Sequence, residues 1–238
     1  MIVLDRLSKR FRAAGRSIVV ADAISATFPS GVAVALLGRN GAGKSTLLQM
    51  IAGTSRPDRG RVLTDGRVSY PVGLASALHP DLTGAQNTRF VARIYGADTG
   101  EVTRFVEEFA QLGAQFRAPV RTYYSGMRAR LAFGINMALD FDTYLIDEVT
   151  GAGDQAFQDR ARAVFTQRMA GAGALFVSHS IPMLRRMCRA GAVLDQGRLS
   201  YFDDLEDAIA AYRAVLHRDR DKDRDQDGHT PPQTEAAA

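Results

Sequence analysis

The chain has few of the features that would place it outside the cytoplasm or inside a membrane. Its 238 residues include a single cysteine, Cys188, which excludes an internal disulfide framework. The longest apolar run, residues 32–37, is far shorter than the roughly 20 residues of a membrane-spanning helix. The first residues lack the basic region, apolar stretch and cleavage site of a signal peptide. We therefore expect a protein of the reducing cytoplasm that meets a membrane only through a partner.

Lysine is also scarce, with 3 residues against 27 arginines, and the sequence contains no internal repeat. The net charge is +4, but residues 217–238 carry six acidic and four basic side chains, so the rest of the chain is more basic. A basic body without a stripe of interleaved aromatic residues predicts no nucleic-acid partner. The alternating Arg/Asp segment has almost nothing to bury, so residues 217–238 are predicted to be a disordered charged tail.

Short apolar segments alternate with helical patterns along residues 1–216, which we expect to form one domain. Three of these segments are predicted to be buried strands: residues 32–37, 144–147 and 174–178. The first precedes a Gly-rich loop and a helix at 44–52. This alternation predicts an α/β fold with a mainly parallel sheet.

A different pattern occupies residues 80–140, where apolar side chains recur at helical spacing. It predicts a helical insertion between the first and second buried strands, with one of its helices at 128–139. A hairpin at 193–201 and an amphipathic helix at 205–216 complete the predicted domain.

Residues 38–46, with the sequence Gly-Arg-Asn-Gly-Ala-Gly-Lys-Ser-Thr, lie between the first strand and its helix and form a P-loop pattern. Glycines allow successive backbone N–H groups to curl around phosphate oxygens at a helix N-terminus. Lys44 would bring positive charge to the β- and γ-phosphates, and the Ser45 hydroxyl can ligate Mg²⁺. A chance Gly-rich turn is expected only a few times in about a thousand such chains. The expected nucleotide-binding residues are Gly38, Asn40, Gly41, Ala42, Gly43, Lys44, Ser45 and Thr46.

An apolar strand that ends in two carboxylates follows about a hundred residues later. Asp147 would lie beside the P-loop and, with Ser45, hold the metal directly or through water. Glu148 would face the γ-phosphate and orient or deprotonate the attacking water. Two carboxylates that merely cap a surface strand are the alternative, and the P-loop makes it the weaker one.

Residues 124–133, Tyr-Ser-Gly-Met-Arg-Ala-Arg-Leu-Ala-Phe, open a predicted helix. Ser125 and Gly126 would offer a hydroxyl and free backbone N–H groups at the helix N-terminus, which suits an anion. An ordinary helix N-cap would be the better interpretation if the segment stood alone. In its context, the segment resembles the signature sequence of ABC ATPases.

The order and spacing of these motifs resemble the nucleotide-binding domains of ABC transporters over about residues 1–216. The resemblance implies that Asp154 lies in the D-loop, that His179 is the switch histidine contacting the γ-phosphate, and that Phe11 stacks on adenine. An aromatic residue near an N-terminal strand is as often part of the core, so that alternative stays open for Phe11. The residues implied to act in catalysis are Lys44, Glu148 and His179.

The resemblance also implies a RecA-like core with an N-terminal antiparallel β subdomain and an inserted α-helical subdomain. Members of this family bind ATP and Mg²⁺ between two subunits of a head-to-tail dimer, so Ser125 and Gly126 would serve the partner subunit's ATP. Closure and opening of a homodimer would drive an integral-membrane permease, which would hold this chain at the cytoplasmic face of a bacterial inner membrane.

Within the family, the chain resembles the ATPase subunits that export capsule, O-antigen and teichoic-acid type polysaccharides. The segments that carry this likeness are residues 37–43, 82–84 with Asn87, 124–131, and 144–149 with 153–154. Some O-antigen exporters have an additional carbohydrate-binding β-domain, whereas about 22 hydrophilic residues follow the last predicted helix here. Capsule export is therefore the favoured cargo.

Three alternatives remain. An importer or a drug or lipid exporter would use identical chemistry with another cargo. A soluble ABC ATPase of translation or DNA repair is disfavoured by the single P-loop and the lack of sustained heptads. A module that binds ATP without hydrolysis is disfavoured by Glu148, because a degenerate site would be expected to lose the carboxylate that positions water.

One departure from the family concerns the join between the core and the helical insertion. Most ABC ATPases have a glutamine there, but none lies between Gln49 and Gln86 in this chain. No metal contact is therefore expected from residues 70–80. Polysaccharide exporters are similar in having a Gly-rich segment at this place, and we expect coupling to the permease to run through residues 74–87.

Overall fold

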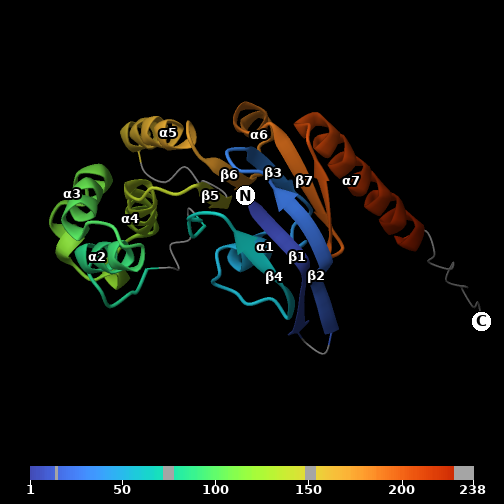
Figure 1. Ribbon diagram of the computed structural model, residues 1–238, viewed down its shortest axis with the longest axis horizontal. Coiled ribbons are helices and arrows are strands. Elements are labelled where there is room, and N and C mark those ends of the chain that lie inside the picture. The colour runs from blue at the N-terminus through green and yellow to red at the C-terminus, as the bar shows by residue number, and fades with distance from the viewer. Residues whose placement is uncertain (14–15, 72–77, 148–153, 228–238) are drawn as a thin grey trace, which may run out of the picture.

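The structure, a computed structural model, describes residues 1–13, 16–71, 78–147 and 154–227 and is built around two sheets (Figure 1). The smaller sheet is antiparallel and has the strand order β2-β1-β4. Its strands are β1 (Ile2–Ala13), β2 (Arg16–Phe28) and β4 (Arg59–Thr64). This is the N-terminal antiparallel β subdomain that the resemblance implied.

The larger sheet has the order β5-β6-β3-β7-β8. Its first four strands are parallel, and β8 runs antiparallel to β7. The strands are β3 (Ala33–Leu37), β5 (Thr143–Asp147), β6 (Gly173–Val177), β7 (Ala190–Asp195) and β8 (Arg198–Phe202). The three predicted buried strands correspond to β3, β5 and β6, which confirms the α/β fold class.

The parallel strands are apolar throughout because a hydrophobic core covers each face of their sheet. Along β3, Ala35 and Leu37 pack with the helical part of the protein, whereas Val34 and Leu36 pack with the smaller sheet. All four side chains are at most 3% exposed. A strand buried on both faces reads as a continuous apolar run, since its alternate side chains both avoid water.

Three helices form a lobe at one end of the molecule, beside the sheets (Figure 1): α2 (Gly84–Ile94), α3 (Thr99–Ala110) and α4 (Ser125–Ala138). Short 3₁₀ turns, η2 (Gly113–Arg117) and η3 (Val120–Thr122), connect α3 to α4. A capping box fixes the start of α2, because Thr83 Oγ1 accepts from the Gln86 N–H and Gln86 Oε1 accepts from the Thr83 N–H. All these elements lie within the predicted insertion at residues 80–140.

The remaining helices are α1 (Lys44–Ile51), α5 (Gln155–Met169), α6 (Ile181–Met187) and α7 (Leu205–Asp227). The predicted hairpin is formed by β7 and β8, whose turn has Gln196 at φ 47° and Gly197 at φ 78°. Positive φ at both positions is the geometry of a type I′ turn, which suits the twist of paired strands.

The last helix differs from the prediction. We expected it to end at Leu216, but α7 continues to Asp227. The added segment contains no Gly or Pro, so no residue type in it breaks the helix. Arg218 also pairs with Asp195 at the end of β7, at 3.6 Å. The predicted disordered tail is thus helical up to Asp227, and its remainder lies outside the described residues.

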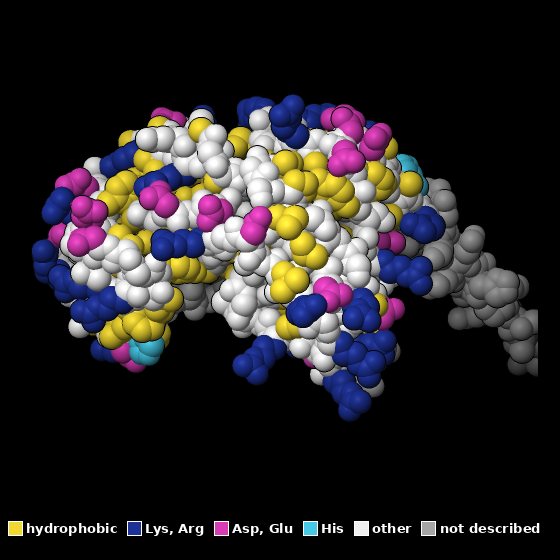
Figure 2. All heavy atoms as spheres, in the orientation of Figure 1, with side chains coloured by type: hydrophobic (Ala, Val, Ile, Leu, Met, Phe, Trp, Pro, Cys, Tyr) yellow, Lys and Arg dark blue, Asp and Glu magenta, His cyan; other side chains and the backbone are white. Residues whose placement is uncertain are grey.

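The described residues include no helix that is both long and apolar enough to cross a membrane. On the face shown in Figure 2, Lys and Arg side chains are scattered over both lobes and interspersed with Asp and Glu.

Candidate functional site

The P-loop follows β3 directly and turns into α1, in a space that admits only glycine at two positions. A Cβ atom on Gly38 would lie 2.5 Å from the carbonyl oxygen of Leu194 in β7. A Cβ atom on Gly43 would lie 2.3 Å from Cγ1 of Val20 in β2, and Gly43 has φ 100°. Both close approaches are shorter than real Cβ contacts. The glycines therefore let the loop pass between two strands and curl before the helix begins.

Lys44, the first residue of α1, folds back over this loop. Its Nζ donates to the carbonyl oxygens of Gly38 at 2.7 Å and Arg39 at 2.8 Å. Gly43 is the N-cap of α1, and no described side chain caps the helix. Backbone N–H groups at an uncapped helix N-terminus, next to an ammonium group, form an anion site.

The other predicted P-loop residues lie at the surface of the same turn. Gly41, Asn40 and Ser45 are exposed, whereas Ala42 and Thr46 are half-buried. Exposure of the Ser45 hydroxyl leaves it accessible to a ligand. The side chains of the next turn, including Leu47 and Leu48, are buried and anchor α1 beneath the loop.

Asp147 and His179 follow two neighbouring parallel strands at the edge where the P-loop lies. Asp147 is the half-buried last residue of β5, and His179 is exposed two residues beyond the end of β6. Strand β6 pairs with both β5 and β3, in parallel. The carboxyl ends of β3, β5 and β6 therefore meet at one edge, which is where ligands bind in open α/β sheets. The predicted water-positioning residue, Glu148, lies outside the described residues.

The donor set at this edge fits Mg²⁺. No group of three or more His, Cys, Asp or Glu that could hold a metal by itself occurs among the described residues. Mg²⁺ usually keeps several waters and takes one or two protein ligands together with phosphate oxygens. Ser45 and Asp147 carry oxygen atoms of the kind that Mg²⁺ prefers, and the helix that carries Ser45 contacts the strand that ends in Asp147.

Ser125 and Gly126 are the first residues of α4, in the other lobe of the molecule. Tyr124 is the N-cap and makes no side-chain capping bond, and its own side chain is 81% exposed. Ser125 is exposed, and the space beside Gly126 Cα is open. The helix thus starts three residues earlier than the predicted 128–139, and it presents free N–H groups to a ligand or partner.

Asp154 is the N-cap of α5. Its carboxylate accepts a hydrogen bond from the Phe157 N–H at 2.8 Å. This contact is a local structural role for the residue that the family resemblance assigns to the D-loop. Its role toward nucleotide stays a prediction.

Phe11 lies near the end of β1 and is 42% exposed, so the alternative that it is a core residue is wrong. Lys9 Nζ lies 5.4 Å from the centroid of its ring. An exposed ring beside a cation is available for stacking on another planar group. Stacking on adenine stays a prediction.

Residues 74–77, the first part of the segment expected to couple to a permease, lie outside the described residues. The following turn is held by Asn87, a side chain that is 2% exposed. Asn87 Oδ1 accepts from the His79 N–H at 2.8 Å, and Nδ2 donates to the carbonyl oxygens of His79, Leu82 and Thr83. This single amide therefore fixes the turn between the core and α2.

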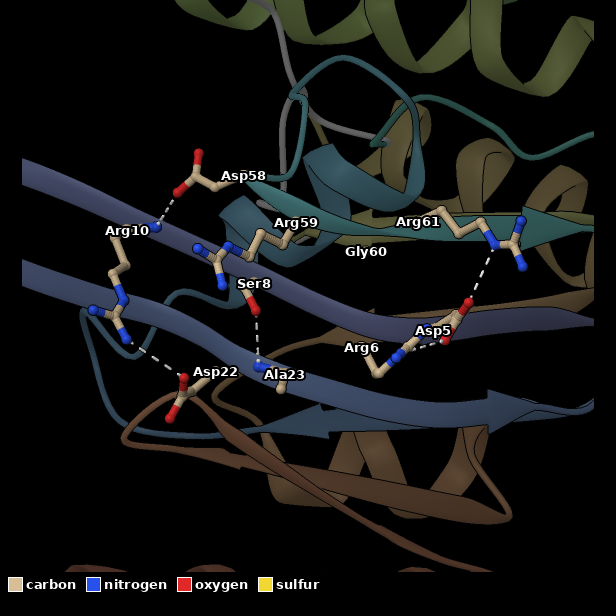
Figure 3. A pocket seen from close by; sticks show the side chains of 10 residues that line it. All are labelled: Asp5, Arg6, Ser8, Arg10, Asp22, Ala23, Asp58, Arg59, Gly60 and Arg61. Carbon is tan, nitrogen blue, oxygen red and sulfur yellow. Dashed lines mark hydrogen bonds and ion pairs between the residues drawn. The ribbon is translucent and has the colours of Figure 1, made fainter.

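A separate hollow of about 870 Å³ lies on the smaller sheet (Figure 3), where β1 bulges against both neighbouring strands. Arg10 lies 3.6 Å from Asp22, and Arg61 Nε lies 3.1 Å from Asp5. None of the predicted site residues lines this hollow. Since these arginines pair with carboxylates of the same hollow, it belongs to the bulge and not to the nucleotide site.

The structure brings the P-loop, Asp147 and His179 to one sheet edge and places Ser125 on a different lobe. Sequence reasoning missed Val20 and Leu194, which shape the P-loop from neighbouring strands. No sequence signal pointed to them, because both are ordinary apolar strand residues whose importance comes from what they touch.

The chain also resembles known proteins. It matches the profile of a family described as ABC transporter over residues 21–151. It is 43% identical over 225 residues to the polysialic acid transport ATP-binding protein KpsT of Escherichia coli, covering 93% of this chain and 99% of that protein. It is 37% identical over 215 residues to the capsule polysaccharide export ATP-binding protein CtrD of Neisseria meningitidis serogroup B, covering 90% and 100%.

Solved structures show the same fold. The ATP binding subunit of an ABC transporter superposes with a TM-score of 0.74 at 22% identity, covering 91% of this chain and 99% of that one. The ATP-binding cassette MJ0796, as a post-hydrolysis dimer bound to ADP and Pi, superposes with a TM-score of 0.71 at 19% identity, covering 86% and 99%.

A parallel sheet with a P-loop at its edge and an antiparallel sheet beside it define the nucleotide-binding domain of a P-loop ATPase. The match to the ABC transporter profile identifies the family within the P-loop ATPases. The chain belongs to the ABC transporter family, as one of its ATP-binding proteins, and ATP hydrolysis is the activity of that family.

Proposed function

We propose that this chain powers the export of a capsular or related surface polysaccharide through an integral-membrane permease. The observation that carries the proposal is its identity of 43% and 37%, over nearly full length, to proteins named for polysialic acid transport and capsule polysaccharide export. The motor chemistry is common to the whole ABC family, so the cargo and the outward direction rest on this likeness.

In the proposed site, the P-loop amides and Lys44 hold the phosphates of ATP. Ser45 and Asp147 would hold Mg²⁺, which neutralises phosphate charge when bound. Glu148 orients or deprotonates the attacking water, and His179 contacts the γ-phosphate. The support for this arrangement is that the ends of β3, β5 and β6 lie at one edge of the sheet.

The proposed working unit is a head-to-tail homodimer in which Ser125 and Gly126 contact the nucleotide of the partner subunit. Two features support it. The α4 N-terminus is exposed and uncapped by any described side chain, and Tyr124 beside it is 81% exposed. An aromatic side chain and free N–H groups at one surface suit an interface that closes on an anionic ligand.

We place the permease contact on the outer face of α2, next to the turn that Asn87 fixes. Phe90 and Ile94 are 57% and 62% exposed and are one helical turn apart, so they present apolar side chains on one face. Large exposed apolar side chains that lie together mark an interaction site. This surface lies on the helix that contains Asn87, the last residue of the segment where coupling was expected.

A Glu148→Gln variant tests the motor and the cargo together. We expect purified Glu148→Gln to lose steady-state ATP hydrolysis, because an amide cannot take a proton from water. Cells that carry only this variant should lose surface polysaccharide and retain polymer in the cytoplasm. The matched control is Glu108→Gln, which changes an exposed residue of α3 in the helical lobe. This variant should leave ATP hydrolysis and surface polysaccharide unchanged. Loss of ATP hydrolysis with normal surface polysaccharide would support the assignment as an ATPase and reject polysaccharide as the cargo.

A second experiment separates coupling from catalysis. Replacing both Phe90 and Ile94 by serine should abolish polysaccharide export while the purified subunit keeps its basal ATPase activity. The control is Leu63→Ser, which removes an apolar side chain that is 47% exposed on β4. Equal loss of export and basal ATPase in the α2 variant would contradict the assignment of this surface.

A further inference from the structure

A contact between a cation and an aromatic ring joins the signature helix α4 to the D-loop helix α5 near their N-terminal ends. Towards the other end of the two helices, Arg168 Nε of α5 donates to the Met137 carbonyl oxygen of α4 at 3.0 Å. Arg130 Cζ lies 4.8 Å from the centroid of the Phe157 ring. The Nε atom of Arg130 is buried, and no hydrogen-bond acceptor in the described part of the chain reaches it. A guanidinium placed this way is held mainly by the aromatic face, because the negative face of the ring quadrupole attracts a cation.

Phe157 cannot easily move in response. Its ring is 2% exposed and meets the rings of Phe109 at 5.3 Å and Phe133 at 6.4 Å, both edge-on. Phe109 belongs to α3 and Phe133 to α4, so the ring is wedged into the helical lobe although it comes from α5. A side chain packed on several sides transmits a displacement instead of absorbing it.

The backbone of Phe157 also takes part in the N-cap of α5, because its N–H donates to the carboxylate of Asp154 at 2.8 Å. One residue therefore holds the cap of α5 through its backbone and the helical lobe through its ring. On the other side of the contact, Arg130 is only five residues from Ser125 along the continuous helix α4. The start of α4 and the start of α5 are thus linked by a short chain of direct contacts.

We propose that Arg130 and Phe157 are a pair of positioning residues that fix the Ser125 end of α4 relative to Asp154. The two polar groups then approach a nucleotide as one unit. The proposal rests on the proposed function, because that function is what places Ser125 and Asp154 at a nucleotide. Neither Arg130 nor Phe157 needs to touch ATP for this role.

The pair makes a distinct kinetic prediction. In Arg130→Met, the P-loop is unaltered, so the Kd for ATP measured by binding to the purified chain should change less than about twofold. The kcat should fall by about tenfold or more, since small misplacements of positioning groups have effects of this size. Arg130→Lys keeps the charge without the planar guanidinium and should be intermediate. Arg162→Met, on an exposed position of α5, is the control.

A double-mutant cycle tests whether the two residues act together. If Arg130 and Phe157 act through the same interaction, Arg130→Met combined with Phe157→Leu should lower kcat no further than the more severe single variant. Multiplication of the two effects would overturn the proposal. So would an unchanged kcat in Arg130→Met, or a weakened Kd with kcat intact. Should Arg130→Met fail to fold, Arg130→Lys carries the same kinetic test.

Hydrogen exchange gives a readout that does not depend on ATP hydrolysis. The Phe157 amide should exchange at least about tenfold faster in Arg130→Met, because its bond to Asp154 is no longer supported by the wedged ring. Unchanged exchange would overturn the proposal even in a chain that hydrolyses ATP. Absence of ATPase activity in the wild-type chain would instead reject the proposed function, and the exchange result would still report on the contact.

Discussion

Replacing Gly43 by alanine should destabilise the protein through a clash that comes from a distant strand. Gly43 has φ 100°, and a Cβ atom built there would lie 2.3 Å from Cγ1 and 3.2 Å from Cβ of Val20. Val20 is 5% exposed within β2, so its side chain has little room to withdraw. Either the strand or the start of α1 must shift.

Two penalties add in Gly43→Ala. Placing an alanine in the left-handed region raises its free energy by about 1–2 kcal/mol. Overpacking a well-filled core adds about 1–3 kcal/mol. Gly41→Ala isolates the first penalty, because Gly41 has φ 79° and a Cβ atom there would have no neighbour within 4 Å. Both changes restrict the unfolded chain equally, so that effect cancels in the comparison.

The measurement is equilibrium unfolding in urea, supported by thermal melting. Gly43→Ala should lower the free energy of unfolding by about 1–3 kcal/mol more than Gly41→Ala. For a chain of this size, that difference corresponds to a Tm about 2–12 °C lower. In a Val20→Ala background, where Cγ1 is gone and only the 3.2 Å approach to Cβ is left, the penalty of Gly43→Ala should fall toward that of Gly41→Ala. Equal destabilisation by the two glycine variants, or no relief from Val20→Ala, would refute the reasoning.

Two further predictions concern buried groups. Burial raises the pKa of the Cys188 thiol to about 12. At pH 8, iodoacetamide should therefore alkylate the folded protein at least about a thousandfold more slowly than the urea-unfolded chain, as followed by mass spectrometry. Comparable rates would contradict the burial of this thiol. Asn87→Leu leaves an N–H and three carbonyl groups without their amide partner and should lower the free energy of unfolding by about 2–4 kcal/mol in urea, whereas Thr88→Val, which removes one bond to the Gly84 carbonyl, should lower it by about 1 kcal/mol. Similar losses in the two variants would show that Asn87 is not the main support of the turn.

Much of the fold could be predicted from the chain alone, because its signals are local. The strands β3, β5 and β6 are continuous apolar runs, and the helices of the insertion repeat at helical spacing. The end of α7 could not be predicted in the same way. Low hydrophobicity indicated a disordered tail, whereas the absence of helix breakers and an ion pair to Asp195 favoured continuation to Asp227.

The candidate nucleotide site likewise depends partly on local motifs and partly on tertiary contacts. The roles predicted for Lys44, Ser45 and Asp147 rest on residue type and local context, because a P-loop and an acidic strand end are contiguous motifs. Tertiary structure decided that β6 lies between β3 and β5, which brings His179 to the edge shared by the P-loop and Asp147. It also decided that Phe11 is exposed.

By itself, the sequence therefore determined which chemical groups are present and which backbone segments carry them. Only the tertiary structure decided which of these groups are neighbours, and which apolar residues confine them. The space that forbids a Cβ at Gly43 is set by Val20, and the residue that holds Asp154 in place also lies against Arg130. Such contacts join residues far apart in the chain, where no local pattern of residue types records them.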